Sequence, residues 1–317
     1  MLRYAIRRIL LMIPVIIGVS FLIFFIMDMA PGDIVDIRYA EEGLTAEELE
    51  DLRAQYGLNG SVFDRYFHYM VQFVQGDLGR SSTTGKPVLS SYLEKLPATV
   101  ELALASIIVS VFISIPLGII SAIKRGTFVD NSAMVLSFLG LSIPNFWLGL
   151  MLMIVFALNL KWLPSGGNME GIRSVILPAI TVGTGLTATL ARTTRSSMLD
   201  VLSQDYLRTE RAKGNPEFKV ITKYALRNAL IPIITIAGGQ FAVCLGGSVL
   251  TETVFSWPGV GRLIVDSLNS RDVPMVVGCI ILKSFSIGIV VLIVDLLYAV
   301  IDPRIKAQYA RKRRART

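Results

Sequence analysis

The sequence predicts an all-α integral membrane protein with six transmembrane helices and an external helical cap after the first of them. Of its 317 residues, 53% are hydrophobic and 17% are charged, whereas soluble domains are about 45–50% apolar and about 25% charged. The mean hydropathy is +0.59. Apolar residues are gathered into long runs, and most Lys and Arg residues lie between alternate runs. These features are typical of a chain that crosses a bilayer several times.

Six apolar runs are long enough to cross roughly 30 Å of hydrocarbon, which takes about 20 residues in a helix. They are Ile9–Met27, Val100–Ile123, Ser132–Leu160, Val175–Ala191, Leu230–Leu250 and Val276–Ile301. The fourth run is the least apolar, because threonines interrupt it. We keep it as a span, because without it the basic segments would fall on both faces of the membrane.

Basic residues flank the predicted spans on one side. Three precede the first span, two follow the second, eight lie in residues 192–227 and seven in residues 304–316. The positive-inside rule places these segments in the cytoplasm, together with both termini of a multi-pass protein of the inner (plasma) membrane. The net charge of +7 then reflects contacts with anionic membrane lipids, and we expect no nucleic-acid partner.

Neither the N-terminal run nor the cysteines indicate a secreted protein. No small-x-small cleavage site follows the first run, so we interpret it as a retained anchor rather than a signal peptide. Cys244 and Cys279 both fall within predicted spans, where we expect small apolar packing residues rather than a disulfide.

The residues between the first two spans, 30–97, are predicted to form the cap, with eleven acidic and six basic residues. Thr45 and Glu48 have the spacing of a capping box that begins a helix, and Gly57 is suited to end it. A second helix over Val62–Gln75 carries an aromatic stripe that we interpret as a packing face. His68, the chain's single histidine, has no Cys, Asp or Glu at ligand spacing, so we expect no metal site.

The loop between the fourth and fifth spans is predicted to contain two helices around a glycine hinge. Ser203 can cap the first helix, Asp205 suits its first turn, and Gly214 fits a left-handed end. Asn215 can cap the second helix, with Pro216 at its first position. The first helix would project charged surface into the cytoplasm, which suits docking of a soluble partner.

The second helix carries a basic stripe at a spacing of four residues, formed by Lys219, Lys223 and Arg227. Apolar residues occupy its other side. This pattern is typical of an amphipathic helix lying at the level of the lipid headgroups.

At this point the chain resembles a known family. The run Asp205-Tyr206-Leu207-Arg208-Thr209-Glu210-Arg211-Ala212-Lys213-Gly214, with Ala225–Pro232 after it, is similar to the EAA loop of ATP-binding-cassette importer permeases. More narrowly, the chain resembles the dipeptide/oligopeptide permeases. The other motifs that carry this resemblance follow in order along nearly the whole chain: Arg7-Arg8, Pro31-Gly32-Asp33, Gly76-Asp77-Leu78-Gly79, Ser142-Ile143-Pro144, Phe146-Trp147, Arg195–Leu199, Leu250–Gly259, Val294–Tyr298 and Asp302-Pro303-Arg304.

The resemblance implies a type I importer permease fold and a set of partners. Two cytoplasmic ATPase subunits, which would bind ATP and magnesium, are expected to dock on the loop 205–214. A second homologous permease would complete the pathway as a heterodimer, and an extracytoplasmic peptide-binding protein would deliver substrate. The implied coupling residues are Asp205, Tyr206, Arg208, Thr209, Glu210, Ala212, Lys213 and Gly214. An external scoop loop is implied at Glu252, Phe255, Trp257, Pro258 and Gly259.

Two departures from the family pattern concern surfaces. The family commonly has Ala where Glu210 stands, which changes the charge of the docking surface. The external stretch Lys161–Arg173 is shorter than in some dipeptide permeases, which limits transfer of substrate choice from relatives.

The chain has no phosphate-binding loop of the form G-x-x-x-x-G-K-[ST], so we expect no cofactor of its own and no ATP hydrolysis. It also has no nucleophile elbow and no H-E-x-x-H motif, which argues against a membrane enzyme. A self-sufficient channel or ion-coupled carrier is the competing class, although we find no internal repeat of the kind carriers show. Within the importer class, a nickel chelate or an oligosaccharide is the alternative to peptides.

Charged and hydroxyl residues within spans give candidates for the pathway or a gate. Asp295 is expected to pair with Arg192 or Arg195, as a structural clasp or part of an inner gate. Thr181, Thr184 and Thr187 recur every three residues, which suits either a wet conduit or hydrogen bonds between helices.

The predicted domain organisation has three parts. Residues 1–94 form the first span and the cap, residues 95–302 the permease domain, and residues 303–317 a basic cytoplasmic tail.

Overall fold

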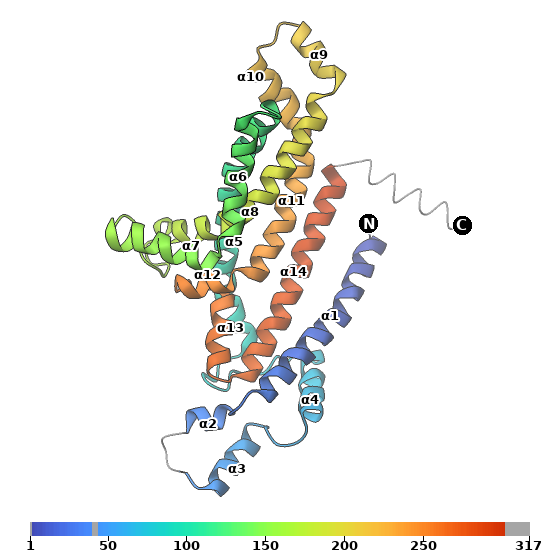
Figure 1. Ribbon diagram of the computed structural model, residues 1–317. Helices are drawn as coiled ribbons and strands as arrows, with labels where there is room; N and C mark the ends of the chain where they lie inside the picture. Colours follow the sequence, from blue (N-terminus) through green and yellow to red (C-terminus); the bar gives the residue numbers. More distant parts are fainter. Residues whose placement is uncertain (1, 40–43, 302–317) are drawn as a thin grey trace, which may run out of the picture. The chain divides into compact units, whose positions relative to one another are not determined.

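The computed structural model describes residues 2–39 and 44–301, and in these residues the regular structure is helical. The predicted all-α class is therefore confirmed for this part of the chain. The described residues pack into two compact units, one formed by residues 2–39, 44–100 and 256–288 and the other by residues 101–255 and 289–301 (Figure 1). The predicted tail and the motif Asp302-Pro303-Arg304 lie outside the described residues.

The first unit contains the cap, which we define as residues 30–87. Its helices are α1 (Leu2–Met29), α2 (Ile34–Arg38), α3 (Ala46–Gln55), α4 (Val62–Val74), the start of α5 (Val88–Ile123), α13 (Val260–Asn269) and the start of α14 (Val273–Ile301).

Local sequence explains where the cap helices begin and end. The side chain of Thr45 accepts from the amide of Glu48, and the Glu48 carboxylate accepts from the amide of Thr45 at 2.8 Å. The predicted capping box is therefore confirmed. Gly57 takes a φ of +65° just after α3, the left-handed conformation that glycine adopts without strain. On α4, Tyr69 is buried in a cluster with Phe24 and Val277, as expected for a packing stripe.

The second unit contains most of the membrane-length helices. The helices of this unit are the remainder of α5, α6 (Phe128–Ser142), α7 (Asn145–Leu152), the π-helical segment η1 (Met153–Asn159), α8 (Ile172–Leu202), α9 (Asp205–Ala212), α10 (Glu217–Lys219), the π-helical segment η2 (Val220–Ala225), α11 (Leu226–Gly247), α12 (Val249–Val254) and the remainder of α14.

Among the described residues, five helices are long and apolar enough to cross a membrane, and a bent pair makes a sixth if it counts as one span. That pair coincides with the third predicted span, which is a broken helix rather than a continuous one. The chain bends by 95° between 128–142 and 145–159. Pro144 has no N–H to continue the helix and confines Ile143 to an extended conformation, with φ −86° and ψ 125°.

The boundary predicted between a membrane-surface helix and the fifth span is wrong. Helices α10, η2 and α11 follow one another without a break, and the apolar helix extends over Glu217–Gly246. The sequence contains no Gly or Pro between residues 217 and 231, so nothing ends the helix after the basic stripe.

The fourth predicted span, α8, is the most buried. In its apolar window 67% of the residues are buried, compared with 28% or less in the other four candidate helices. A Cβ atom on Gly140 would lie 2.6 Å from the carbonyl oxygen of Thr184, and one on Gly183 would lie 2.7 Å from that of Ser106. Glycine thus lets α6 and α5 approach α8 closely. This burial explains why a span of low hydropathy can be stable.

Candidate functional site

α9 is a short polar helix in the loop between α8 and α11. Its buried side chain is Leu207, which lies in a cluster with Met198 of α8, Ala122 of α5 and Val220 of η2. A helix of eight residues is marginal in water by itself. Packing of Leu207 therefore positions α9 against the ends of α5 and α8.

Hydrogen bonds on the same side attach α9 to the helix that follows. The hydroxyl of Tyr206 donates to the carbonyl oxygen of Tyr224 at 3.2 Å and accepts from the side-chain amide of Asn228 at 2.7 Å. Both partners lie at the junction of η2 and α11. α9 is thus connected to α11 as well as to α8.

Glu210 binds the residues that follow the end of α9. Its carboxylate accepts from Lys213 Nζ at 2.6 Å and from Asn215 Nδ2 at 2.9 Å. The hydrogen bond from Lys213 lowers the pKa of Glu210, and this effect exceeds the opposing effect of burial. The carboxylate therefore remains an ionised acceptor.

Arg211 bridges from α9 to the first residue of α10. Its Nε and Nη2 donate to the two carboxylate oxygens of Glu217 at 3.0 and 2.8 Å. Gly214, with φ +79°, lies between the two ends of this bridge. The predicted left-handed conformation at the end of α9 is confirmed. The side-chain bonds between Arg211 and Glu217 bridge the turn that contains Gly214.

The two capping predictions in this loop are wrong. Ser203 Oγ donates back to the carbonyl oxygen of Asp200 at 2.8 Å, and Gln204 precedes α9 without a side-chain cap. Asn215 donates to Glu210, and Pro216 rather than Asn215 is the residue before α10. The charged Glu210 carboxylate is a stronger acceptor than a neutral group, which explains the direction of the Asn215 side chain.

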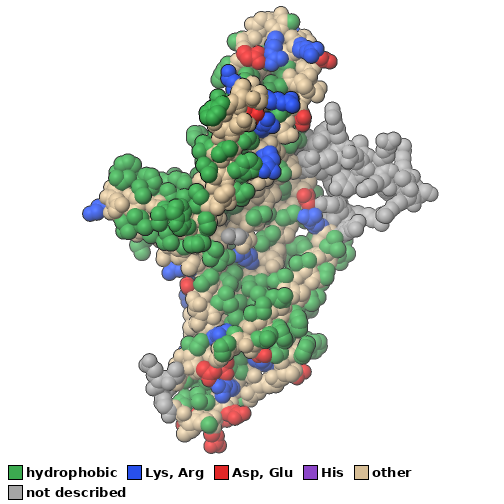
Figure 2. All heavy atoms as spheres, in the orientation of Figure 1, with side chains coloured by type: hydrophobic (Ala, Val, Ile, Leu, Met, Phe, Trp, Pro, Cys, Tyr) green, Lys and Arg blue, Asp and Glu red, His purple; other side chains and the backbone are tan. Residues whose placement is uncertain are grey.

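The opposite side of α9 is open to solvent. The side chains of Asp205 and Arg208 are 93% and 79% exposed, and Thr209, Ala212 and Lys213 are also exposed. Figure 2 shows acidic and basic side chains gathered around α9 and α10, with hydrophobic side chains over α6 and α7. The surface thus offers charges of both signs on a fixed support, an arrangement suited to binding a folded protein.

The predicted basic stripe lies on the first turns of the α10–α11 helix. Lys219, Lys223 and Arg227 are exposed, and Phe218 beside them is 79% exposed. Ala225, on another face, is completely buried. The stripe is therefore a cationic edge with an aromatic residue at its start.

Sequence reasoning missed the buried acid Asp130, which is 3% exposed in the first turn of α6. Arg195 of α8 donates to it from Nε and Nη2, each at 2.8 Å. Asp130 also accepts from the amide of Gly126 at 2.9 Å and from the hydroxyl of Ser121. We call these four residues the clamp. The sequence signal that could have identified Asp130 is an acidic residue shortly after Lys124-Arg125, next to a predicted span.

The clamp contains one of the two arginines predicted as partners of Asp295. Arg195 binds Asp130 with two nitrogens, and the pairing of Asp295 with Arg192 or Arg195 stays a prediction. The guanidinium of Arg192 lies over the ring of Phe138, 4.8 Å from its centre. Both arginines thus join α8 to α6.

The predicted threonine face is largely buried. Thr181 and Thr187 are 0% and 4% exposed. Their hydroxyls and that of Thr184 each donate to the carbonyl four residues earlier, at 2.8–3.0 Å. Satisfied hydroxyls against close helices favour packing over a wet conduit on this face.

The predicted scoop-loop residues fall where the chain passes from the second unit to the first. In the second unit, Glu252 is completely buried and accepts from Ser248 Oγ at 2.9 Å, and Phe255 is 1% exposed. In the first unit, the buried indole of Trp257 donates to the carbonyl oxygen of Ala98 at 2.8 Å. Pro258 is half-buried and Gly259 is buried. These side chains therefore fix the segment rather than project from it.

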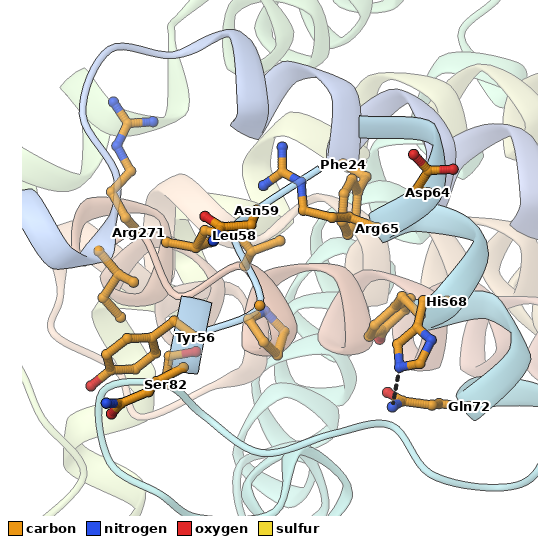
Figure 3. A pocket seen from close by; sticks show the side chains of 16 residues that line it. Phe24, Tyr56, Leu58, Asn59, Asp64, Arg65, His68, Gln72, Ser82 and Arg271 are labelled. Atoms are coloured by element: carbon orange, nitrogen blue, oxygen red, sulfur yellow. Dashed lines mark hydrogen bonds between the residues drawn. The ribbon is translucent and has the colours of Figure 1, made fainter. Parts of the chain in front are cut away.

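The cap contains a cavity of about 590 Å³ between α3, α4 and the turn before α14. Figure 3 shows Arg65, His68 and Gln72 along α4 at one side and Tyr56 and Ser82 at the other. His68 Nε2 lies 3.0 Å from Gln72 Nε2 in a hydrogen bond. Within residues 2–39 and 44–301, no group of three or more His, Cys, Asp or Glu side chains is arranged to hold a metal ion.

Comparison with known families gives matches over nearly the whole chain. The family described as "binding-protein-dependent transport system inner membrane component" matches residues 114–307, and the model of its N-terminal part matches residues 1–103.

Curated relatives match at full length. The oligopeptide transport system permease protein AppB of Bacillus subtilis (strain 168) is 42% identical over 316 residues, which are 96% of this chain and 100% of that protein. The dipeptide transport system permease protein DppB of Escherichia coli (strain K12) is 38% identical over 336 residues, covering 96% and 99%. The glutathione transport system permease protein GsiC of the same strain is 41% identical over 306 residues, also covering 96% and 99%.

Among solved structures, an inward-facing MetNI methionine ABC transporter matches with a TM-score of 0.56 at 14% identity. The match covers 68% of this chain and 97% of the transporter chain. At this identity the likeness concerns the fold.

Proposed function

This chain belongs to the family of binding-protein-dependent transport system inner membrane components, and from that premise we propose that it forms the peptide pathway of an ATP-driven importer. Membership makes it a multi-pass permease subunit that works with an ATPase and a substrate-binding protein. We propose that a second, homologous permease completes the pathway as a heterodimer. Two ATPase subunits would bind ATP and magnesium, and this chain would hold no cofactor.

The observation that carries the coupling proposal is the two-sided construction of α9. One side is buried through Leu207 and bonded through Tyr206, and the other presents exposed Asp205 and Arg208. A partner that binds the exposed side would therefore move the ends of α5, α8 and α11 with it. We call α9 the coupling helix.

The proposed mechanism uses this connection. Closure of the ATPase subunits on ATP displaces the coupling helix, and the bonded turn around Gly214 transmits the displacement to α11. The pathway then opens to one side of the membrane at a time. Because Arg211 and Glu217 bridge the turn, it acts as a stiff joint rather than a free hinge.

We propose that both termini and the coupling helix are cytoplasmic and that the cap faces outward. The basic stripe, with exposed Phe218 beside it, supports contact with anionic lipids at the inner leaflet, since cationic and aromatic side chains both favour the headgroup region.

Peptides are the proposed substrates, because relatives of 38–42% identity over nearly the full length are named for oligopeptide, dipeptide and glutathione transport. Nickel chelates and oligosaccharides remain the alternatives within the same class. The test is uptake competition in a strain whose chromosomal copy of this permease gene is deleted and which expresses the permease from a plasmid. Labelled dipeptide uptake should be inhibited by unlabelled di-, tri- or pentapeptides. Inhibition only by a sugar or a metal chelate would overturn the peptide assignment.

A further inference from the structure

The coupling helix packs directly against α5, α8 and η2, and the clamp attaches the first turn of α6 to α8. Arg195 lies within the last two turns of α8, just before the loop that carries the coupling helix. Its fork holds Asp130 at the start of α6. The clamp is therefore the ionic connection between the coupling end of α8 and the base of α6.

Asp130 joins three elements through one carboxylate. It accepts from Ser121 on α5, from the Gly126 amide in the α5–α6 turn, and from Arg195 on α8. A bidentate arginine pair fixes orientation as well as distance. A carboxylate at the N-terminus of α6 is also favoured by the helix dipole. This network fixes the first turn of α6 against α5 and α8.

Further contacts carry this register along the helices. Arg192 stacks on Phe138, and Gly140 brings the backbone of α6 against Thr184 of α8. The two helices therefore touch at several successive levels above the clamp.

α6 ends at the bend before α7, and α7 touches the segment near residue 255. A Cβ on Gly149 of α7 would lie 2.9 Å from the Phe255 ring, and the Phe255 carbonyl accepts from the Gly167 amide at 2.8 Å. A displacement of the first turn of α6 can thus reach Phe255 through the bend and the close contact of α7 with the Phe255 ring.

We propose that Asp130 and Arg195 are positioning residues of the transport cycle, and that their clamp makes α6 follow the coupling helix so that its displacement reaches α7 and Phe255. This proposal rests on the proposed importer function. It assigns the broken third span to the moving part of the permease. Without the clamp, the ATPases would still hydrolyse ATP, but only the packing of α6 against α8 would carry the stroke, and α6 would follow α8 less completely.

The first test uses Asp130→Asn in the complete transporter, reconstituted with its binding protein in vesicles. Peptide uptake per ATP hydrolysed should fall clearly below the wild-type ratio, while ATP hydrolysis continues. The matched control is Glu170→Gln, which removes the exposed ion pair with Arg173 near the opposite end of α8. That variant should keep the wild-type ratio.

A second variant separates coupling from simple stability. Cysteines replace Asp130 and Arg195 in a chain whose Cys244 and Cys279 are changed to Ala. A short, cleavable thiol crosslinker then restores the connection, and uptake per ATP is measured before and after cleavage in the same preparation. The crosslinked form should show the higher ratio. Equal ratios in both forms, or a wild-type ratio for Asp130→Asn, would overturn the proposal. Absence of ATP-dependent uptake by the wild-type transporter would instead contradict the importer function itself.

Discussion

Replacement of Leu207 by Ala tests whether packing holds the coupling helix in place. Leu207 is completely buried, and truncation of a buried leucine costs about 2–5 kcal/mol. The Arg211–Glu217 ion pair, whose side chains are 38% and 55% exposed, contributes only about 0–1 kcal/mol. Packing therefore stabilises the docked helix more than the ion pair does. A loss of about 2 kcal/mol lowers the docked population of the coupling helix about 30-fold relative to the detached one.

The assay combines two measurements on the reconstituted transporter. Hydrogen exchange of the amides in residues 205–212 should become faster, and peptide uptake per ATP hydrolysed should fall. Membrane insertion should be unchanged, because the predicted spans are untouched. The matched control is Glu170→Gln, which removes an exposed ion pair with Arg173 outside the coupling helix, with at most a small effect on either measurement. Wild-type exchange and uptake in Leu207→Ala would refute the reasoning.

Further predictions concern the joint and the cap. Gly214→Val should place a side chain at φ +79°, which costs about 1–2 kcal/mol. No atom lies within 4 Å of the added Cβ, so the variant should still insert into the membrane. ATP hydrolysis should continue while peptide uptake falls, and normal uptake would contradict a stiff joint at Gly214. Burial alone would raise the pKa of Asp33, but the hydrogen bond from Arg53 and the further bonds to this carboxylate outweigh it, and the pKa lies below its ordinary value. The resulting stability is present above the ordinary pKa of about 3.9 and is lost as pH falls through the folded value. Limited proteolysis of the cap should therefore accelerate in that acid range, and Arg53→Gln should weaken this dependence. Tyr69→Phe removes a buried hydroxyl that has no hydrogen-bond partner among the described residues, so thermal stability should stay equal or rise, and a clear fall would contradict the unpaired state.

Hydropathy and charge located the spans, because both signals are summed over many residues. The third span shows what such sums miss. Ser132–Leu160 contains no charged residue, yet the chain turns by 95° at Pro144. Proline within α8 and α11 leaves those helices intact. Whether a proline bends or breaks a helix depends on packing around it, which composition does not contain.

Within the candidate site, short-range features were predictable and long-range partners were not. Gly214 ends α9 as its residue type indicates. Asp130 and Arg195 are separated by 65 positions in sequence, so no local spacing connects them, and Arg195 was instead one of two candidate partners for Asp295. The caps failed for a related reason, since Asn215 found a charged acceptor in Glu210.

The proposed mechanism requires that a separate ATPase acts on the coupling helix. Uptake of labelled dipeptide into proteoliposomes tests this requirement most directly. Vesicles with the complete assembly should accumulate labelled dipeptide only when ATP and the binding protein are supplied, and Leu207→Ala should reduce that accumulation. Accumulation at the same rate by vesicles that contain this chain without any ATPase would contradict the mechanism.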